Sequence, residues 1–111
     1  ESGCMQFIPR SHLSEDILEH RHINDDPLVH GLVTDHADAD RAVACPIDAG
    51  GATFHHCRTL HYAAPNTTGR ARRAYITVFS TQPRKRQTPV ARPWIEDEAE
   101  ALAKLNSVAR P

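Results

Sequence analysis

The sequence is poor in aromatic residues and has no excess of either charge. Aromatic side chains make up 5% of the 111 residues, and all hydrophobic types together reach 40%. A core built from so few large side chains would be thin, which indicates part of a larger domain. The chain has 13 Lys and Arg residues against 14 Asp and Glu, a formal net charge of -1. No overall field therefore attracts nucleic acid or an anionic membrane.

Long hydrophobic runs and paired cysteine motifs are also missing. No stretch reaches the roughly 18 apolar residues of a membrane span, and the N-terminus lacks the pattern of a signal peptide. The expected compartment is therefore the cytoplasm. Cys4, Cys45 and Cys57 are odd in number and form no Cys-x-x-Cys motif. This pattern predicts buried, reduced thiols and argues against both a disulfide framework and a structural zinc site. Because position 1 is Glu instead of Met, we expect the chain to begin inside a longer protein.

Short apolar segments bounded by turn formers predict a mainly β fold. Residues 4–9 and 42–45 are two such segments, each followed or closed by a proline, and residues 52–56 follow a Gly-Gly turn. The strongest strand pattern is at residues 72–79, which are rich in β-branched and aromatic types. Both faces of this segment are largely apolar, which is typical of a strand in a sandwich or barrel.

The remaining segments divide the chain. Residues 10–40 are polar and lack a clear period, which predicts a long surface insertion that serves as a loop or lid. Within it, residues 14–20 are predicted to form one or two helical turns. Residues 93–110 start with Pro and acids and keep apolar side chains at helical spacing, which predicts a C-terminal α-helix. The expected organisation is a domain over 1–80, a linker over 81–92 and this helix.

Histidine, in contrast, is abundant. The chain has eight, and neutral imidazole is a common ligand of iron and zinc. The most informative one is His61, which follows a predicted strand and precedes a Pro-Asn-Thr-Thr-Gly turn, after which Arg72 begins the next predicted strand. Four others lie in polar surroundings and are expected to be solvated: His12, His20, His22 and His30.

Three separated motifs occur in a fixed order along residues 2 to 80. They are Gly-Cys-Met-Gln-Phe-Ile-Pro at 3–9 with Ser11-His12, Ala-Gly-Gly-Ala-Thr-Phe-His-His at 49–56 with Thr-Leu-His at 59–61, and Pro-Asn-Thr-Thr at 65–68 with Arg-Arg-Ala-Tyr at 72–75. Together they resemble the phytanoyl-CoA dioxygenase family of iron(II)- and 2-oxoglutarate-dependent oxygenases. The eleven-residue step from His61 to Arg72 matches the family's spacing between an iron-binding histidine and a co-substrate-binding arginine.

The resemblance implies the C-terminal part of a double-stranded β-helix, or jelly roll, whose mouth holds iron through two histidines and one carboxylate. His61 matches the distal iron ligand, and Arg72 matches the residue that pairs with the 5-carboxylate of 2-oxoglutarate. Thr59, Gln6 and Ile8 are further candidates to line the co-substrate pocket. The implied activity is hydroxylation of a small organic or lipid-like substrate by dioxygen, with Fe(II) as cofactor and 2-oxoglutarate as co-substrate.

The chain departs from the family pattern in several places. Ala63 stands where relatives often carry a serine that contacts the same carboxylate, and Arg10 replaces the glycine of a Pro-Gly-Ser-His turn. The family's His-x-Asp or His-x-Glu motif, which supplies the other two iron ligands, precedes the segment matched by residues 3–9. His36 and Asp38 have that spacing but follow this segment, in an acidic run typical of a surface loop. We therefore do not expect the 111-residue chain to be active by itself.

Two other interpretations stay open. One is a non-catalytic jelly-roll remnant, which the missing motif favours. The other is a histidine-based metal-binding module in which His55, His56 or His36 joins His61.

The arginines also have a plainer interpretation. Arg70, Arg72 and Arg73 form a basic cluster that is compatible with a solvated strand end. The basic run at residues 84–86 is expected to be a solvated linker face instead of a nucleic-acid site. The residues favour no particular substrate and no particular oligomeric state.

Overall fold

The computed structural model of the chain describes residues 2–29, 31–82 and 90–108. Its backbone divides into two compact units. The first unit contains Glu1–Ile17 and Ala37–Val78, and the second contains Leu18–His36 and Phe79–Pro111. The predicted boundary at residue 80 is therefore close to the end of the first unit, while part of the predicted insertion belongs to the second.

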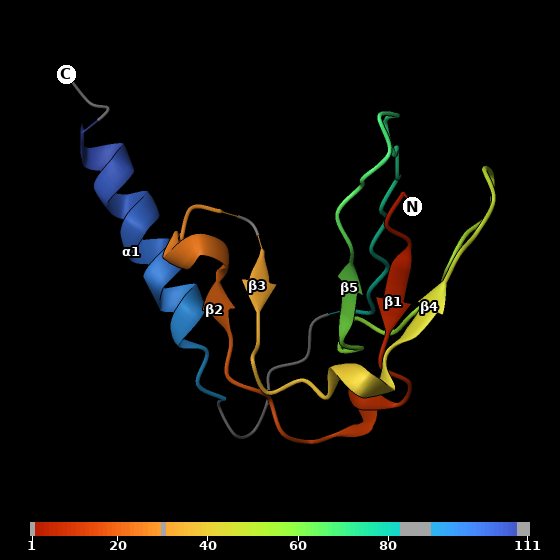
Figure 1. Cartoon of the computed structure of the whole chain (residues 1–111). Helices are drawn as coiled ribbons and strands as arrows, with labels where there is room; N and C mark the ends of the chain where they lie inside the picture. Colours follow the sequence, from red (N-terminus) through yellow and green to blue (C-terminus); the bar gives the residue numbers. More distant parts are fainter. Residues whose placement is uncertain (1, 30, 83–89, 109–111) are drawn as a thin grey trace. The chain divides into compact units, whose positions relative to one another are not determined.

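A three-stranded antiparallel sheet forms the centre of the first unit (Figure 1). Strand β1, Met5–Phe7, lies between β4, Val43–Cys45, and β5, His61–Ala63. At the middle of β1, Gln6 is paired with Ala44 on one side and Tyr62 on the other. The strands predicted within residues 4–9 and 42–45 are confirmed.

The small core of the first unit lies at the end of β1. Ile8 is buried, with 7% of its surface exposed, and its N–H donates to the Leu60 carbonyl at 2.9 Å. The Ser11 hydroxyl donates to the Ile8 carbonyl at 2.8 Å and accepts from the Leu60 N–H, also at 2.8 Å. These bonds join the turn after β1 to Leu60, the residue that precedes β5. The start of β5, where His61 lies, is therefore held by both Ile8 and Ser11.

The turn after β1 keeps the backbone conformation of a glycine turn although its residue is an arginine. Arg10 has φ 64° and ψ 5°, in the left-handed region that favours glycine. A single 3₁₀ turn, η1, follows at Ser11–Leu13. The helical turns predicted for residues 14–20, all of which the structure describes, do not form. Instead the Ser14 hydroxyl accepts from the Asp16 N–H at 3.2 Å, a local bond that competes with helix.

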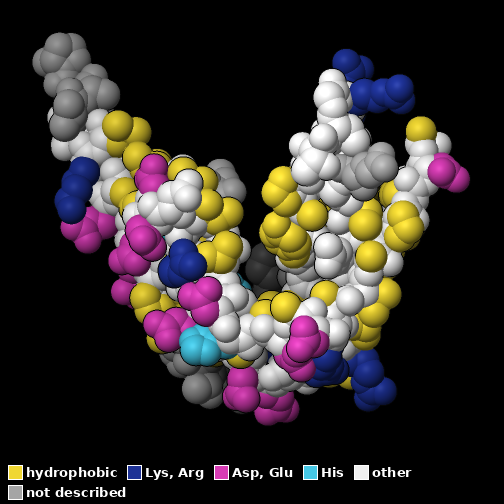
Figure 2. Space-filling model, in the orientation of Figure 1, with side chains coloured by type: hydrophobic (Ala, Val, Ile, Leu, Met, Phe, Trp, Pro, Cys, Tyr) yellow, Lys and Arg dark blue, Asp and Glu magenta, His cyan; other side chains and the backbone are white. Residues whose placement is uncertain are grey.

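The predicted strands at 52–56 and 72–79 are wrong. Neither segment pairs with a strand among the described residues, and 94% of Tyr75, 85% of Ile76 and 79% of Val78 is exposed. Strand propensity reflects packing against neighbouring strands, so an apolar extended segment without a partner is not a strand. Hydrophobic side chains are also exposed at other positions of the first unit (Figure 2), including Phe54 at 91%.

The second unit combines a short hairpin with a helix. Strand β2, Arg21–His22, pairs antiparallel with β3, Leu32–Val33, and the 3₁₀ turn η2, Ile23–Asp25, follows β2. The irregular surface insertion predicted for residues 10–40 therefore contains ordered hairpin structure. It also contains η3, Ala39–Arg41, which belongs to the first unit.

Helix α1 spans Pro93–Val108, so the predicted C-terminal helix is confirmed over the part of it that the structure describes. Proline is favoured at the first position of a helix, because an N–H there would have no partner within the helix. The negative charge of Glu96, in the first turn, lies near the positive end of the helix dipole. Within the described residues no helix has the length and apolarity of a membrane span. Residues 109–110, the basic run at 84–86 and His30 lie outside the described residues.

Two expectations about side-chain surroundings need correction. His22 is buried, with 8% of its surface exposed, and its Nε2–H donates to the Trp94 carbonyl at 2.9 Å. All three cysteines are free thiols, as predicted, but none of them is buried: Cys4 and Cys45 are half-buried and Cys57 is exposed. A hydrogen bond to a backbone carbonyl explains how the polar sequence around His22 is compatible with burial.

Candidate functional site

The tautomer of His61 is set by the chain itself. His61 is the first residue of β5, its side chain is exposed, and its Nδ1 lies 2.7 Å from the Thr59 carbonyl oxygen. A carbonyl only accepts hydrogen bonds, so Nδ1 carries a ring hydrogen, and in the neutral ring Nε2 carries the lone pair. Metal-bound histidines in proteins are commonly oriented by such a bond from the other ring nitrogen. The imidazole is therefore arranged to offer Nε2 to a metal ion.

Two aromatic rings lie beside His61. The ring centroids of His55 and His61 are 4.8 Å apart, and Phe7 lies 4.8 Å from His55 and 6.2 Å from His61. Desolvation lowers the pKa of His55, and repulsion from the charged form of His61 lowers this pKa further. Both effects favour a neutral His55 ring. No spacing in the sequence indicates this cluster, because β1, which carries Phe7, and the loop before β5, which carries His55, come together only in the fold.

The other histidines proposed as partners of His61 have different neighbours. The ring of His56 lies 5.2 Å from that of His12, and its Nδ1 accepts from the Arg58 N–H at 3.1 Å. Among the described residues, no group of three or more His, Cys, Asp or Glu side chains is arranged to hold a metal ion. The described part of the chain thus supplies a pair of neighbouring imidazoles, His55 and His61, and no complete site.

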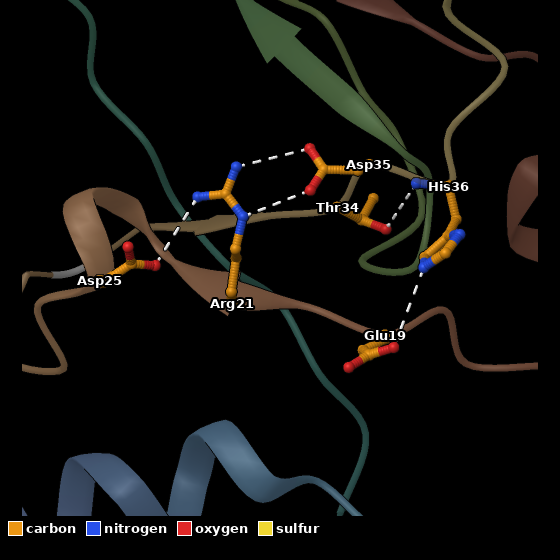
Figure 3. Close-up of polar contacts among 6 residues, drawn as sticks. All are labelled: Glu19, Arg21, Asp25, Thr34, Asp35 and His36. Carbon is orange, nitrogen blue, oxygen red and sulfur yellow. Dashed lines mark hydrogen bonds and ion pairs between the residues drawn. The ribbon is translucent and has the colours of Figure 1, made fainter.

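His36 lies in the second unit, in a surface network of charged groups (Figure 3). Its Nε2 is 3.9 Å from a carboxylate oxygen of Glu19, and 61% of its side chain is exposed. Next to it, Arg21 lies between Asp35, at 3.3 Å, and Asp25, at 4.0 Å. An exposed ion-pair network of this kind fits the interpretation of the His36 and Asp38 run as solvated surface.

Arg72 is held by backbone carbonyls. Its Nη1 donates to the Ser2 carbonyl at 3.0 Å, to the Ala64 carbonyl at 2.9 Å and to the Gly3 carbonyl. Its Nε and Nη2 make no hydrogen bond to any residue that the structure describes. Among the described residues, the guanidinium therefore has partners on one nitrogen only, and the side chain as a whole is exposed.

The three secondary candidates have distinct positions. Thr59 is 9% exposed, its N–H donates to the His56 carbonyl at 2.9 Å, and its carbonyl accepts from His61. The structure thus gives Thr59 a contact with His61 through its backbone, whereas the sequence pointed to its hydroxyl. Gln6 is half-buried at the centre of β1, and Ile8 belongs to the core.

The second unit contains a cavity of its own. It has a volume of about 530 Å³ and is lined by residues that include His20, His22 and Trp94. None of the predicted site residues lines it. We assign the candidate site from the chemistry around His61 and Arg72, because cavity size alone carries no information about metal or carboxylate binding.

The region that contains His61 and Arg72 is similar to known proteins. Residues 1–74 match the family model of phytanoyl-CoA dioxygenase (PhyH). The structure is also similar to the crystal structure of EvdO2 from Micromonospora carbonacea var. aurantiaca, with 47% sequence identity and a TM-score of 0.58. That match covers 63% of this chain and 28% of the EvdO2 chain. No curated protein gives a significant match to the chain.

Proposed function

The chain belongs to the phytanoyl-CoA dioxygenase family, and on this premise we propose that it is the C-terminal part of an iron(II)- and 2-oxoglutarate-dependent dioxygenase. The proposed reaction is hydroxylation of a small organic or lipid-like substrate, with dioxygen as the second substrate. The observation that carries the proposal is the bond from His61 Nδ1 to the Thr59 carbonyl at 2.7 Å. It leaves Nε2 free at the position where the family motif has an iron-binding histidine.

The residues present fit part of an iron site. His61 supplies one imidazole with its hydrogen on the correct nitrogen, and the lowered pKa of the neighbouring His55 favours the ring form without a positive charge. A facial site needs two further ligands on the same side of the ion. We propose that a His-x-Asp or His-x-Glu motif in the longer natural protein supplies them.

Arg72 fits the role of a carboxylate receptor. Arginine offers parallel N–H groups whose fork geometry matches a carboxylate, and such charge-assisted pairs are stronger than neutral hydrogen bonds. Because the backbone carbonyls occupy only Nη1, the edge formed by Nε and Nη2 keeps its donors. We propose that this edge pairs with the 5-carboxylate of 2-oxoglutarate and so orients the keto acid with its other end toward His61.

Bound iron with 2-oxoglutarate and dioxygen supplies the oxidising power for attack on a C–H bond. The chain's own residues contribute orientation and surroundings. The rings of Phe7 and His55 lie beside the His61 ring, and the hydrogen bond from Nδ1 to the Thr59 carbonyl orients it. Pre-arranged ligands lose less entropy when the metal binds, so these contacts favour iron binding at His61 Nε2.

The proposed architecture is the C-terminal part of a jelly roll. The exposed apolar side chains of Tyr75, Ile76 and Val78 support this proposal, because a segment with two apolar faces needs cover on both sides. We propose that strands of the longer natural protein pair with this segment. The matched region spans 28% of the EvdO2 chain, which leaves ample sequence for such strands in a protein of that size.

Iron binding by the full-length natural protein tests the proposal. Anaerobic equilibrium dialysis with Fe(II) is expected to give one tightly bound ion per chain, and His61→Ala is expected to lower the affinity at least a hundredfold. His36→Ala is the matched control, because it removes another exposed imidazole, one in the second unit, and is expected to leave the affinity within twofold. Equal affinities of wild type and His61→Ala would overturn the assignment of His61. Loss of binding in His36→Ala would move the site to the second unit.

A further inference from the structure

We infer that Gly3 is a positioning residue for the co-substrate. Its carbonyl, with those of Ser2 and Ala64, fixes the Arg72 guanidinium so that the edge formed by Nε and Nη2 is presented to a carboxylate. The inference rests on the proposed function, in which Arg72 pairs with 2-oxoglutarate, and it concerns a residue that touches Arg72 and not the co-substrate.

The three carbonyls saturate one nitrogen of Arg72. Nη1 has two N–H groups and three acceptors, so at least one bond is shared between two carbonyls. Two acceptors come from the segment before β1, and the third, Ala64, directly follows β5. The plane of the guanidinium is therefore defined by two chain segments that the sheet already holds together.

Three N–H groups remain on the guanidinium, one on Nε and two on Nη2. A carboxylate that binds through Nε and Nη2 accepts two parallel bonds and leaves the occupied nitrogen undisturbed. A free arginine side chain has four flexible torsions, and ordering such a side chain on binding costs conformational entropy. Because the carbonyls already order the Arg72 side chain, this entropy is not lost again when the ligand binds.

Glycine is required at position 3 for two reasons. Gly3 has φ 74°, a conformation that residues with a side chain rarely adopt. In addition, a Cβ at this position would lie 2.0 Å from the Ala64 carbonyl oxygen and 2.6 Å from Arg72 Nη1. The oxygen is part of the backbone next to β5, so the clash displaces the guanidinium or opens the edge of the sheet.

Gly50 provides a matched control. It also has a positive φ, 89°, but a Cβ there would meet no atom within 4 Å. Gly50→Ala therefore introduces the same kind of backbone strain without touching Arg72. A difference between the two variants isolates the close approach at Gly3.

The experiment uses the full-length natural protein loaded anaerobically with Fe(II). Dissociation constants are measured for 2-oxoglutarate and for 2-oxopentanoate, which has a methyl group in place of the 5-carboxylate. We expect Gly3→Ala to weaken 2-oxoglutarate binding at least tenfold while the constants for 2-oxopentanoate and Fe(II) stay within twofold. Gly50→Ala is expected to leave all three constants within twofold, and adding Gly3→Ala to Arg72→Ala is expected to cause no further loss.

Each outcome decides a different point. If Gly3→Ala matches Gly50→Ala, or weakens both keto acids equally, the positioning role of Gly3 is refuted while the role of Arg72 stands. If Arg72→Ala itself binds 2-oxoglutarate as well as the wild type, the proposed function of Arg72 fails, and the inference with it.

A measurement on the wild type covers the case in which Gly3→Ala does not fold. Nitrogen NMR of arginine-labelled protein reports rotation of the guanidinium about its terminal C–N bonds. If the three carbonyls hold Nη1 in place, Nη1 and Nη2 of Arg72 are expected to give separate signals in the absence of 2-oxoglutarate. A single averaged signal would overturn the inference.

Discussion

Replacing Arg72 with lysine separates its geometry from its charge. In the structure Nη1 serves three backbone carbonyls, and two other nitrogens remain for a ligand. A lysine ammonium keeps the positive charge but places all its donors at one point, so it cannot serve the carbonyls and a carboxylate in the same way. We therefore expect Arg72→Lys to lose at least one charge-assisted bond to 2-oxoglutarate.

The size of the effect follows from that bond count. A hydrogen bond to a charged group contributes about 1.5–3 kcal/mol, which corresponds to a loss of about 10- to 150-fold in affinity. Arg72→Ala loses both bonds and is expected to bind more weakly still. Anaerobic titration of 2-oxoglutarate into the Fe(II)-loaded full-length protein measures the constants, and denaturant unfolding checks that each variant remains folded. An Arg72→Lys variant that binds 2-oxoglutarate within threefold of the wild type would refute this reasoning.

Two further predictions concern stability. Arg10→Gly removes a left-handed arginine at φ 64° and is expected to stabilise the full-length protein by about 0.5–1 kcal/mol in urea unfolding, whereas an unchanged or lower midpoint would contradict the strain argument. In helix α1, the hydrogen bond from Lys104 and its positive charge hold the pKa of the exposed Glu100 carboxyl below its ordinary value, with Nζ and Oε1 2.7 Å apart. This contribution is present above the unfolded pKa of about 4.3 and is lost as the pH falls through the folded value. Circular dichroism from pH 7 to pH 3 should show a smaller acid-dependent loss of helix in Glu100→Gln than in the wild type, and identical curves would exclude the pair as a source of helix stability.

Local signals predicted the parts of the fold that depend on neighbouring residues in the chain. Pro9 closes the β1 segment, and Pro93 starts α1 where the apolar spacing of the helix begins. Both features act within a few residues, so they are readable without knowledge of the fold.

The errors occurred where structure depends on distant partners. Residues 72–79 have strong strand propensity, but propensity cannot supply the neighbouring strand that the described residues lack. His22 was expected in solvent because its neighbours are polar, yet the Trp94 carbonyl, 72 positions along the chain, accepts its Nε2–H. The sequence contains no local sign of such a contact.

The candidate site shows the same division. His61 and Arg72 were found from a motif with a fixed spacing, and the resemblance also singled out Arg10 as standing in a glycine position, which its φ of 64° agrees with. The carbonyls around Arg72 and the ring of Phe7 beside His61 were missed. Backbone acceptors leave no trace in residue type, although the glycine at position 3 was a signal that the chain comes close to another group there.

The most direct test of the account is the visible absorption of the full-length natural protein after anaerobic addition of Fe(II) and then 2-oxoglutarate. Chelation of the keto acid by iron gives a charge-transfer band that neither component gives alone. We predict this band in the wild type, its loss in His61→Ala, and its appearance at higher 2-oxoglutarate concentrations in Arg72→Lys. A wild-type protein that binds Fe(II) and 2-oxoglutarate without producing the band would contradict it.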